Sequence, residues 1–477
     1  MTATGVPLAP GCRPVLGHVA QFLRRPLPFL ESLPDVGDLV EVRLGPMRMY
    51  MACSPELTWQ VLTNDRVFDK GGTLFGQIRQ IAGNGLITCM HRDHRRQRRL
   101  AQPAFHAKRI AAYGAMMATQ VEQMVGSWQD GQIVDVPTEM VALTSNTVVE
   151  TVFSSSLTPE TRGQVAGNLT EIMRSLLRRT VSPAALNKVP TPGNLRFARA
   201  CRELRTRTVG VIAERRREQN DVGDLLSALI EANDEESRDA LSHFADEEIV
   251  DQFVTFFVAG SETTASALSW SLYLLARHPE VQEQLQAEVD AVLGGRNPTT
   301  DDVPRLGLIG RTITESLRMY PPAALFFTRE VTAPVRLGEH DLPAGATVAY
   351  SSYLIHHRAD LYPDPHRFDL DRTYPRQGFV PFAAGARKCI GDNYAMAEAT
   401  IALAAILSRG QVETVPGEEV VPAHAISLRP RHLFLRFTER TPAPPVPRAA
   451  PGGVPSEVAC AEATAGSAPA PGRGEWR

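Results

Sequence analysis

A cysteine in a glycine-containing loop is the residue of this sequence best suited to chemistry. Cys389 ends the segment Phe379-Val-Pro-Phe-Ala-Ala-Gly-Ala-Arg-Lys-Cys and comes directly before a predicted helix that begins near Asp392. At a helix amino terminus, with Arg387 and Lys388 beside it, the thiolate form is favoured by the helix dipole and by the two cations. Loop amides can donate to the sulfur, and glycine lets the backbone approach a flat ligand. These features would suit a thiolate ligand, but without further context a lone cysteine is more often a small buried hydrophobic residue.

A carboxylate and several hydroxyls interrupt the apolar centre of a long predicted helix. We expect this helix over 246–277, with Asp246 as its cap and His278-Pro279 as its end. Residues 253–259 are apolar, but Gly260-Ser-Glu-Thr-Thr follows at once. Glycine costs about 1 kcal/mol in a helix interior, and a buried carboxylate needs partners. The segment is therefore either a packing notch with satisfied polar groups or a loosened turn beside a cofactor, where Glu262 and Thr263 handle protons.

Four segments of the sequence together resemble the cytochrome P450 family. The haem-ligand signature of that family, F-x-x-G-x-R-x-C-x-G, is met at every fixed position over 382–391. The segment 315–318 resembles the E-x-x-R helix of the family, 365–368 resembles its P-x-R-F segment, and 259–264 matches its A-G-x-[DE]-T-T helix. All four segments occur in the order that the family shows, so the resemblance extends through most of the chain before residue 440.

The resemblance implies a single-domain, triangular-prism fold that is mainly α with small β-sheets. It also implies haem b (iron protoporphyrin IX) with Cys389 as the iron ligand, and a monooxygenase that inserts one oxygen atom of O2 into an apolar small molecule. Thr263 and Glu262 would form its proton relay. Glu315, Arg318 and Arg367 would form a buried network that holds the cysteine loop, although a pair three residues apart on a helix is often a plain surface contact. The residues that match cofactor-binding positions are His94, Arg98, Arg329, Arg387, Phe382 and Gly391, and those that match substrate-facing positions are Thr255, Ala259, Leu325 and Phe327.

Apolar side chains near these motifs predict an apolar substrate pocket. The side chains are Phe253, Phe256, Phe257, Leu325, Phe326 and Phe327, and about half of them could instead be plain core. The loop 70–86 and the region around Ile426 are expected to close the pocket, which suits a terpene or macrolide better than a charged metabolite. Segments 10–18 and 94–99 are similar to actinomycete members of the family that oxidise sesquiterpenes such as pentalenene or epi-isozizaene in secondary metabolism and antibiotic biosynthesis. Polyketide, macrolide or fatty-acid hydroxylation is the alternative.

The run 91–99 is strongly basic. Nucleic-acid binding is disfavoured, because the chain has a net charge of −3 and no aromatic residues interleave the run. The ordinary interpretation is an exposed helix face. Under the resemblance, Arg95, Arg96, Arg99 and Lys388 would point outward and form a cationic docking site for an acidic electron donor. No glycine loop for NADPH or flavin phosphates is visible, so ferredoxin and ferredoxin reductase are expected as separate proteins.

Three other functions remain open from the sequence. A haem-thiolate gas sensor or ligand carrier would share the cofactor but need no Glu262–Thr263 relay. A peroxygenase would use peroxide alone and tolerate the loss of Thr263. A helical hydrolase with Cys389 as nucleophile would need a nearby histidine base, for which His356 and His357 are the candidates.

Helical periodicity dominates the elements that must position these residues. The predicted helices are 107–128, 160–179, 195–219, 246–277, 279–293, 308–319 and 392–408. The predicted strands are 39–44 and 47–52, joined by a Gly-Pro turn, and 335–337, 347–350 and 433–437, with a Pro-Ala-Gly turn at 343–345. This pattern favours a mainly α domain over a doubly wound sheet.

Composition restricts the cellular setting. The 477 residues contain six cysteines that lie far apart without a C-x-x-C pair, which disfavours a zinc site or a disulfide scaffold and fits a reducing cytosol. No signal peptide and no apolar run of roughly 18 residues is visible. We therefore expect a cytoplasmic monomer without a membrane span. Residues 441–477 hold eight Pro, nine Ala and five Gly and are expected to be a disordered tail after a catalytic domain over 1–440.

Overall fold

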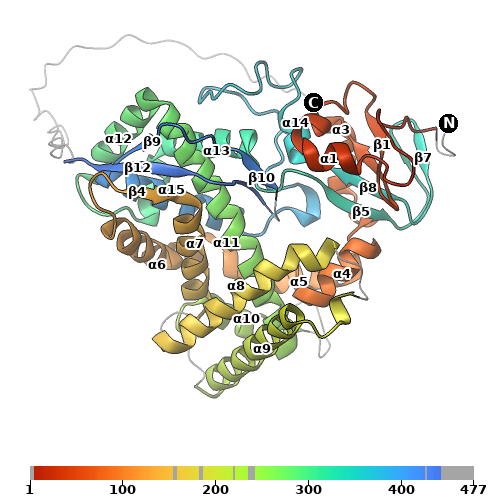
Figure 1. Cartoon of the computed structure of the whole chain (residues 1–477). Coiled ribbons are helices and arrows are strands. Elements are labelled where there is room, and N and C mark those ends of the chain that lie inside the picture. Colours follow the sequence, from red (N-terminus) through yellow and green to blue (C-terminus); the bar gives the residue numbers. More distant parts are fainter. Residues whose placement is uncertain are drawn as a thin grey trace, which may run out of the picture.

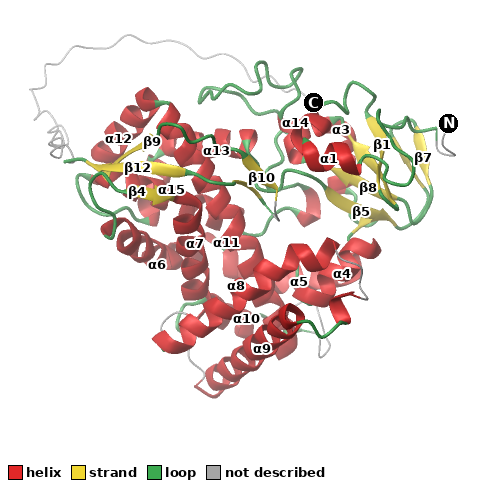
Figure 2. Cartoon of the chain, in the orientation of Figure 1, coloured by secondary structure: helices red, strands yellow, loops and turns green. Residues whose placement is uncertain are grey.

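The computed structural model describes residues 5–153, 158–181, 186–218, 221–234, 242–424 and 427–441. Helices form most of the molecule, and small sheets lie at two opposite sides of the helical body (Figures 1 and 2). This arrangement confirms the mainly α fold with small β-sheets that the sequence predicts. The expected tail from residue 442 onward and the region of Ile426 lie outside the described residues.

The seven predicted helices are all present, with ends within three residues of the prediction. The helices are α1 Val19–Arg24, α2 Pro26–Glu31, α3 Pro55–Thr63, α4 Gly72–Ala82, α5 His91–Ala101, α6 Ala107–Gly126, α7 Val136–Phe153, α8 Pro159–Val181, α9 Pro192–Glu218, α10 Leu225–Glu231, α11 Asp246–Arg277, α12 Pro279–Leu293, α13 Gly307–Met319, α14 Ser352–His356 and α15 Asp392–Arg409. Among the helices of the described ranges, none is both long and apolar enough to cross a membrane.

The expectation of a loop over 70–86 is wrong for most of that segment, because α4 occupies residues 72–82. Two glycines mark the ends of this helix. Gly71 is the extended residue before the helix, and Gly83 ends it with a φ of 73°, a conformation that glycine adopts without strain.

Two of the sheets join segments that are distant in sequence. The larger has the order β1-β2-β8-β5-β3, in which β2 and β8 are parallel and the other neighbours antiparallel. Its strands are β1 Leu39–Leu44, β2 Met47–Ala52, β3 Phe68–Asp69, β5 Phe327–Val331 and β8 Thr347–Tyr350. The second sheet has the order β4-β12-β9, from β4 Ile133–Asp135, β12 Phe434–Glu439 and β9 Gly410–Thr414; two hairpins pair β6 Val335–Leu337 with β7 His340–Leu342 and β10 Pro422–His424 with β11 Leu428–Pro430. All five predicted strands are therefore found.

The long helix α11 runs through the middle of the molecule and packs along α7 (Figure 1). It ends at His278-Pro279 as predicted, but its cap differs from the prediction. Ala245, not Asp246, is the N-cap residue, and the Ala245 amide donates to the Glu248 carboxylate at 2.9 Å. The Glu248 carboxylate, at the third helical position, thus accepts a hydrogen bond from the N-cap amide, which has no partner within the helix.

The turn at 260–264 keeps its helical conformation. The Ser261 hydroxyl donates to the Phe257 carbonyl at 2.7 Å, and the Thr144 hydroxyl of α7 donates to the Ser261 carbonyl at 2.8 Å. These bonds fit the packing-notch interpretation. Two buried polar atoms of the same turn, Glu262 Oε2 and Thr264 Oγ1, nevertheless have no hydrogen-bond partner among the described residues.

Candidate active site

The loop before α15 holds Cys389 through backbone hydrogen bonds. The Cys389 amide donates to the Phe382 carbonyl at 2.9 Å, and the Lys388 amide donates to the Gly385 carbonyl at 3.1 Å. Gly385 has a φ of 68°, and a Cβ there would lie 2.5 Å from the Leu62 carbonyl oxygen of α3. Only glycine fits this position without strain, because both the backbone angle and the space exclude a side chain.

The protein atoms around the Cys389 sulfur favour the neutral thiol. The residue is exposed, yet burial of its sulfur and, to a smaller extent, the Asp392 carboxylate raise the thiol pKa above its ordinary value. The Gly391 amide, Arg98 and Lys388 lower the pKa, but by less than these two causes together raise it. The local charges alone therefore do not produce a thiolate, contrary to the simplest expectation from the sequence. A bound cation would supply the missing stabilisation.

A buried ionic network lies beneath the loop, and its second arginine is not the predicted one. Arg318 Nη2 donates to Glu315 Oε1 at 2.8 Å, and both side chains are fully buried. The third member is Arg372, whose Nε donates to the same Glu315 oxygen at 3.0 Å. The assignment of Arg367 is wrong: that residue contributes only its carbonyl, which accepts from Arg318 at 3.3 Å and from Arg372 at 3.0 Å. The Tyr374 hydroxyl completes the cluster, 3.0 Å from Glu315 Oε2.

His356 connects this network to the cysteine loop. Arg318 Nη1 donates to the His356 carbonyl at 3.0 Å, and the His356 ring accepts from the Val380 amide at 2.9 Å. Burial lowers the pKa of His356 to about 3, so the ring stays neutral and keeps its acceptor. Because that nitrogen is already occupied, His356 is not available as a base for a nucleophilic Cys389.

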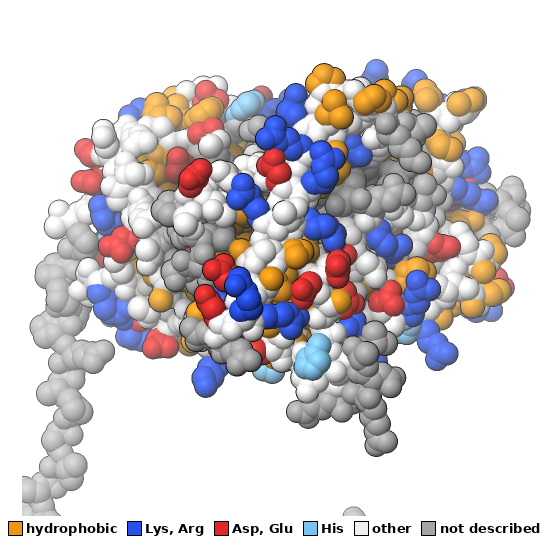
Figure 3. Space-filling model, turned by 90° about the horizontal axis from the view of Figure 1, so that it is seen from below, with side chains coloured by type: hydrophobic (Ala, Val, Ile, Leu, Met, Phe, Trp, Pro, Cys, Tyr) orange, Lys and Arg blue, Asp and Glu red, His pale blue; other side chains and the backbone are white. Residues whose placement is uncertain are grey.

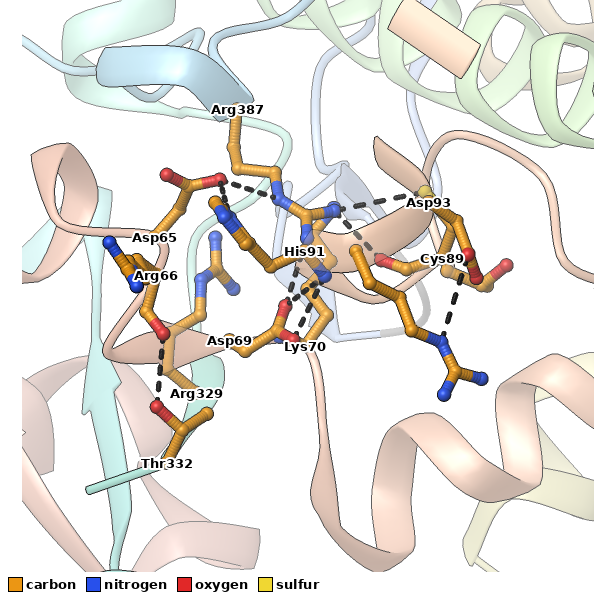
Figure 4. Close-up of polar contacts among 12 residues, drawn as sticks. Asp65, Arg66, Asp69, Lys70, Cys89, His91, Asp93, Arg329, Thr332 and Arg387 are labelled. Carbon is orange, nitrogen blue, oxygen red and sulfur yellow. Dashed lines mark hydrogen bonds and ion pairs between the residues drawn. The ribbon is translucent and has the colours of Figure 1, made fainter. Parts of the chain in front are cut away.

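Arg387 lies at the centre of a second polar cluster (Figure 4). Its Nη2 lies 2.9 Å from Asp69 Oδ1, its Nη1 donates to the Cys89 carbonyl at 2.8 Å, and its Nε is 3.5 Å from Asp65 Oδ2 without a hydrogen bond. Arg329 donates to the Thr328 carbonyl at 2.9 Å and is 3.4 Å from the Tyr350 hydroxyl. The cluster draws on strands β3 and β5 and on the loop before α5.

Lys70 is a member of this cluster that the sequence analysis missed. It lies directly after β3, and its Nζ donates to the Ile87 carbonyl at 2.8 Å. Burial and the charges of Arg329 and Arg387 lower the pKa of Lys70 well below its ordinary value. A single lysine before two glycines carries no pattern that would have identified it.

His94 and Arg98 belong to the same positive region, as their spacing on one helix face predicts. Burial, then the charges of Arg387, Lys70 and Arg98, lower the pKa of His94 to about 3. Arg98 donates to the Lys388 carbonyl, next to Cys389, and burial lowers its pKa.

Among the described residues, the buried cations of this region outnumber its buried carboxylates. Lys70, Arg329 and Arg387 are buried, against Asp65 and Asp69, which both lie beside Arg387. Such an excess of buried positive charge favours an anionic ligand. A dicarboxylate beside the Cys389 sulfur is what a haem would provide, so these residues fit that group.

The basic helix α5 does not present all of its arginines to solvent. Arg96 forms an ion pair with Glu248 at 2.7 Å, and Arg99 forms one with Asp234 at 2.7 Å. Because these two side chains are also only 19% and 34% exposed, the expectation that they point outward as docking cations is wrong, whereas Arg95 and Lys388 are exposed, Lys388 with an ion pair to Asp392 at the start of α15. The partners of Arg96 and Arg99 lie more than a hundred residues away in sequence, where no local pattern shows them. On the face seen in Figure 3, basic and acidic side chains are likewise interspersed.

The predicted proton-relay residues are adjacent on α11 but have different surroundings. The Thr263 hydroxyl donates to the Ala259 carbonyl at 2.6 Å. Burial raises the pKa of Glu262, and Arg429 and Ser427 act in the opposite direction. A pocket bounded by Pro137, Val141, Ser427 and Arg429 reaches Glu262.

The residues predicted to line the substrate pocket divide into buried and partly exposed side chains. Phe253, Phe256 and Phe257 are buried in the main core, with Phe153 and Phe105 edge-on to the first two, so the core alternative is right for these three. Thr255 is buried against Gly85, where a Cβ would meet its hydroxyl at 2.0 Å. The partly exposed residues are Ala259, Leu325, Phe326 and Phe327, of which Phe327 stacks on Tyr350.

A separate apolar pocket lies between α4, α8, α9 and α11. Its apolar lining comes from Ala82, Ile172, Leu204, Val250 and Val254, and the ion pair of Arg205 with Asp251, at 2.8 Å, lies in its wall. Val254, the last α11 residue in its wall, lies about two and a half helical turns before Thr263.

Comparison with known proteins shows to which family the chain belongs. The sequence model of the family "Cytochrome P450" matches residues 7–436. The chain belongs to the cytochrome P450 family. The haem domain of cytochrome P450DA, a crystal structure, superimposes with a TM-score of 0.80 at 26% identity, over 92% of this chain and 98% of that one. The fold is therefore that of a P450 haem domain.

Curated relatives share more sequence identity with this chain than the haem domain of cytochrome P450DA does. Pentalenene oxygenase of Streptomyces avermitilis is 44% identical over 91% of this chain and 97% of its own length. Cyclooctat-9-en-7-ol 5-monooxygenase of Streptomyces melanosporofaciens is 46% identical over 86% of this chain and 90% of its own length. The chain is a haem-dependent P450 monooxygenase that needs O2 and a source of electrons.

Proposed function

We propose that this P450 oxidises a terpene in actinomycete secondary metabolism, with a sesquiterpene as the first candidate substrate. The observation that carries the proposal is the similarity, over most of both chains, to two enzymes whose names specify terpene-derived substrates. Successive oxidations of one carbon are compatible with the same site.

Cys389 is proposed as the iron ligand, and the cations around it as the residues that hold the haem carboxylates. The set is His94, Arg98, Arg329 and Arg387, to which the structure adds Lys70; Phe382 and Gly391 would lie against the ring. When bound, a thiolate-ligated haem supplies the activation of O2. The test is the Cys389→Ser variant: we expect it to lose the Soret shift that carbon monoxide produces in the reduced protein. An unchanged spectrum would exclude Cys389 as ligand.

Thr263 and Glu262 are proposed to deliver protons on the oxygen side. Thr263 uses its proton in the bond to Ala259, so its oxygen is left to accept a hydrogen bond. The raised pKa of Glu262 brings the carboxyl closer to neutral pH, where it can exchange protons. We expect Thr263→Ala to keep the haem spectrum but to release hydrogen peroxide in place of product, and Thr263→Ser to restore coupling. Full coupling in Thr263→Ala, or turnover driven by added peroxide alone, would favour a peroxygenase.

Electrons are proposed to come from a ferredoxin and its reductase, to a monomer in the cytoplasm. Arg95 and Lys388 are exposed, Arg95 on the same helix as Arg98 and Lys388 in the cysteine loop, where its carbonyl accepts from Arg98; they are the docking cations to test. We expect Arg95→Glu with Lys388→Glu to weaken ferredoxin-driven turnover, and most at low salt. Arg196→Glu, a reversal at another exposed arginine, on α9, is the matched control. Equal ferredoxin-driven turnover in the Arg95/Lys388 double variant and in Arg196→Glu would exclude Arg95 and Lys388 as the docking site.

Substrate class is tested by binding spectra and by product analysis. Candidate sesquiterpenes and diterpenes are titrated into the purified holoprotein, and the shift of the resting haem band is measured. Products formed with ferredoxin, reductase and O2 are then identified by mass spectrometry. A shift and oxidised product with macrolides or fatty acids, but with no terpene, would replace the proposed substrate while leaving the P450 assignment intact.

A further inference from the structure

Three side chains that can bind a metal meet at a place that the haem site does not use. Glu31 is the last residue of α2, His357 directly follows α14, and His366 lies in the segment between α14 and the cysteine loop. One ligand atom from each lies within 4.8 Å of the other two. Glu31 is more than three hundred residues from the two histidines, so the meeting of the carboxylate with them is a property of the fold.

Tyr353 orients two of the three side chains. Its carbonyl lies 2.9 Å from His357 Nδ1, and because a carbonyl can only accept, that nitrogen carries the proton. The lone pair of His357 is therefore on Nε2. The Tyr353 hydroxyl donates to Glu31 Oε1 at 2.6 Å, and its ring stacks on His357 with centroids 3.8 Å apart. One residue thus fixes both the tautomer of the histidine and the carboxylate, as outer partners do for metal ligands.

The third residue closes the set from the solvent side. His366 Nε2 lies 3.6 Å from Glu31 Oε1, and the two histidine rings have centroids 5.0 Å apart. The His366 side chain is 67% exposed, so a metal ion has a path of entry. His357 is buried, and this burial lowers its pKa well below the ordinary value, which leaves the ring neutral as a ligand must be.

We propose that Glu31, His357 and His366 bind a divalent zinc-class cation, with water completing a tetrahedral site. Two imidazoles and one carboxylate are a donor set that zinc accepts, at bonds of about 2.0–2.2 Å. Ligand atoms in such a tetrahedron lie roughly 3.4 Å apart. His366 Nε2 is already close to this separation from Glu31 Oε1, at 3.6 Å, and Tyr353 holds Glu31 and His357 in place.

The bound ion would join the amino-terminal helix α2 to the segment that leads to the cysteine. His357 is next to His356, whose carbonyl accepts from Arg318 and whose ring holds the Val380 amide. The site is therefore one residue from the network beneath the cysteine loop. Its role is structural: a metal there ties these two chain segments together without contacting the haem.

The experiment measures zinc on the intact holoprotein. The protein is treated with EDTA, transferred to chelator-free buffer, mixed with about 100 µM ZnCl2 and separated from free metal by gel filtration. Zinc per chain is then measured by atomic emission, with iron measured separately as the count of haem. We expect one zinc per chain and, at saturation, a rise in unfolding temperature of about 3 °C.

Two variants and one control decide the site. His366→Ala removes an exposed ligand and should leave the haem spectrum unchanged while zinc falls to roughly a tenth. Glu31→Gln keeps an acceptor for Tyr353 but removes the charge, and should also lose zinc. His432→Ala, at an exposed histidine outside the cluster, is the matched control and should behave as the parent. No zinc on the parent, or equal zinc on His366→Ala, would show that Glu31 and His366 form only an ion pair and would overturn the proposal.

Discussion

Replacing Arg372 with alanine is expected to destabilise the protein much more than replacing Arg367. The Arg372 side chain is 8% exposed, and besides Glu315 it donates to the carbonyls of Pro363, Asp364 and Arg367 at 2.8–3.1 Å. Breaking a buried ion pair by removing one partner costs about 3–5 kcal/mol. Since Arg318 still neutralises Glu315, the loss from Arg372→Ala should lie at the lower end of that range.

The assay compares three variants by urea unfolding and by thermal unfolding, with the carbon monoxide spectrum as a count of intact haem sites. For a domain of this size the loss corresponds to a fall of about 3 °C in unfolding temperature. Arg367→Ala keeps the carbonyl that the network uses and should change stability by less than about 0.5 kcal/mol. Arg372→Lys keeps the charge but not the planar set of hydrogen-bond donors, so its loss of stability should lie between those of Arg372→Ala and Arg367→Ala. Equal losses in Arg372→Ala and Arg367→Ala would refute the assignment of Arg372.

Three further predictions concern groups elsewhere in the fold. Glu398 is fully buried on α15, neither of its carboxyl oxygens has a hydrogen-bond partner among the described residues, and burial raises its pKa to about 8. The folded state therefore holds a proton that the unfolded state releases above about pH 4.3, so the stability of the protein should fall as pH rises toward 8. Glu398→Gln should remove this pH dependence from urea unfolding midpoints measured at several pH values. Gly385→Ala should cost well over the ~1 kcal/mol expected of Gly131→Ala, because both have positive φ but only Gly385 would also clash with the Leu62 carbonyl; equal unfolding midpoints would contradict this. Arg329→Gln should speed the transfer of haem to apomyoglobin, whereas Arg95→Gln at an exposed position should leave that rate unchanged.

The parts of the fold that follow local patterns were predictable from the sequence. The two strands 39–44 and 47–52 were predicted from strand-like runs on both sides of a Gly-Pro turn. Helix α11 was predicted from the helical periodicity of its apolar residues and from the proline after His278. The cysteine loop followed from its motif. In each case the decisive residues are neighbours in the chain.

The errors fall where partners are distant. Arg372 was missed because motif spacing pointed to Arg367, and only the folded chain shows which guanidinium reaches Glu315. Arg96 was expected to be free because its partner, Glu248, is 152 residues away. Lys70 has no motif at all, and its importance comes from the other cations around it.

The parallel pairing of β2 with β8 has a consequence for the synthesis of the chain. Tyr50 and Val348 are partners in one sheet, so the early hairpin must wait for almost three hundred further residues before its open edge is covered. At about 5–20 residues per second, the ribosome needs on the order of 15–60 s to supply them. During that interval the nascent hairpin exposes backbone groups that other chains could bind, which makes this edge the place where a chaperone would be most useful.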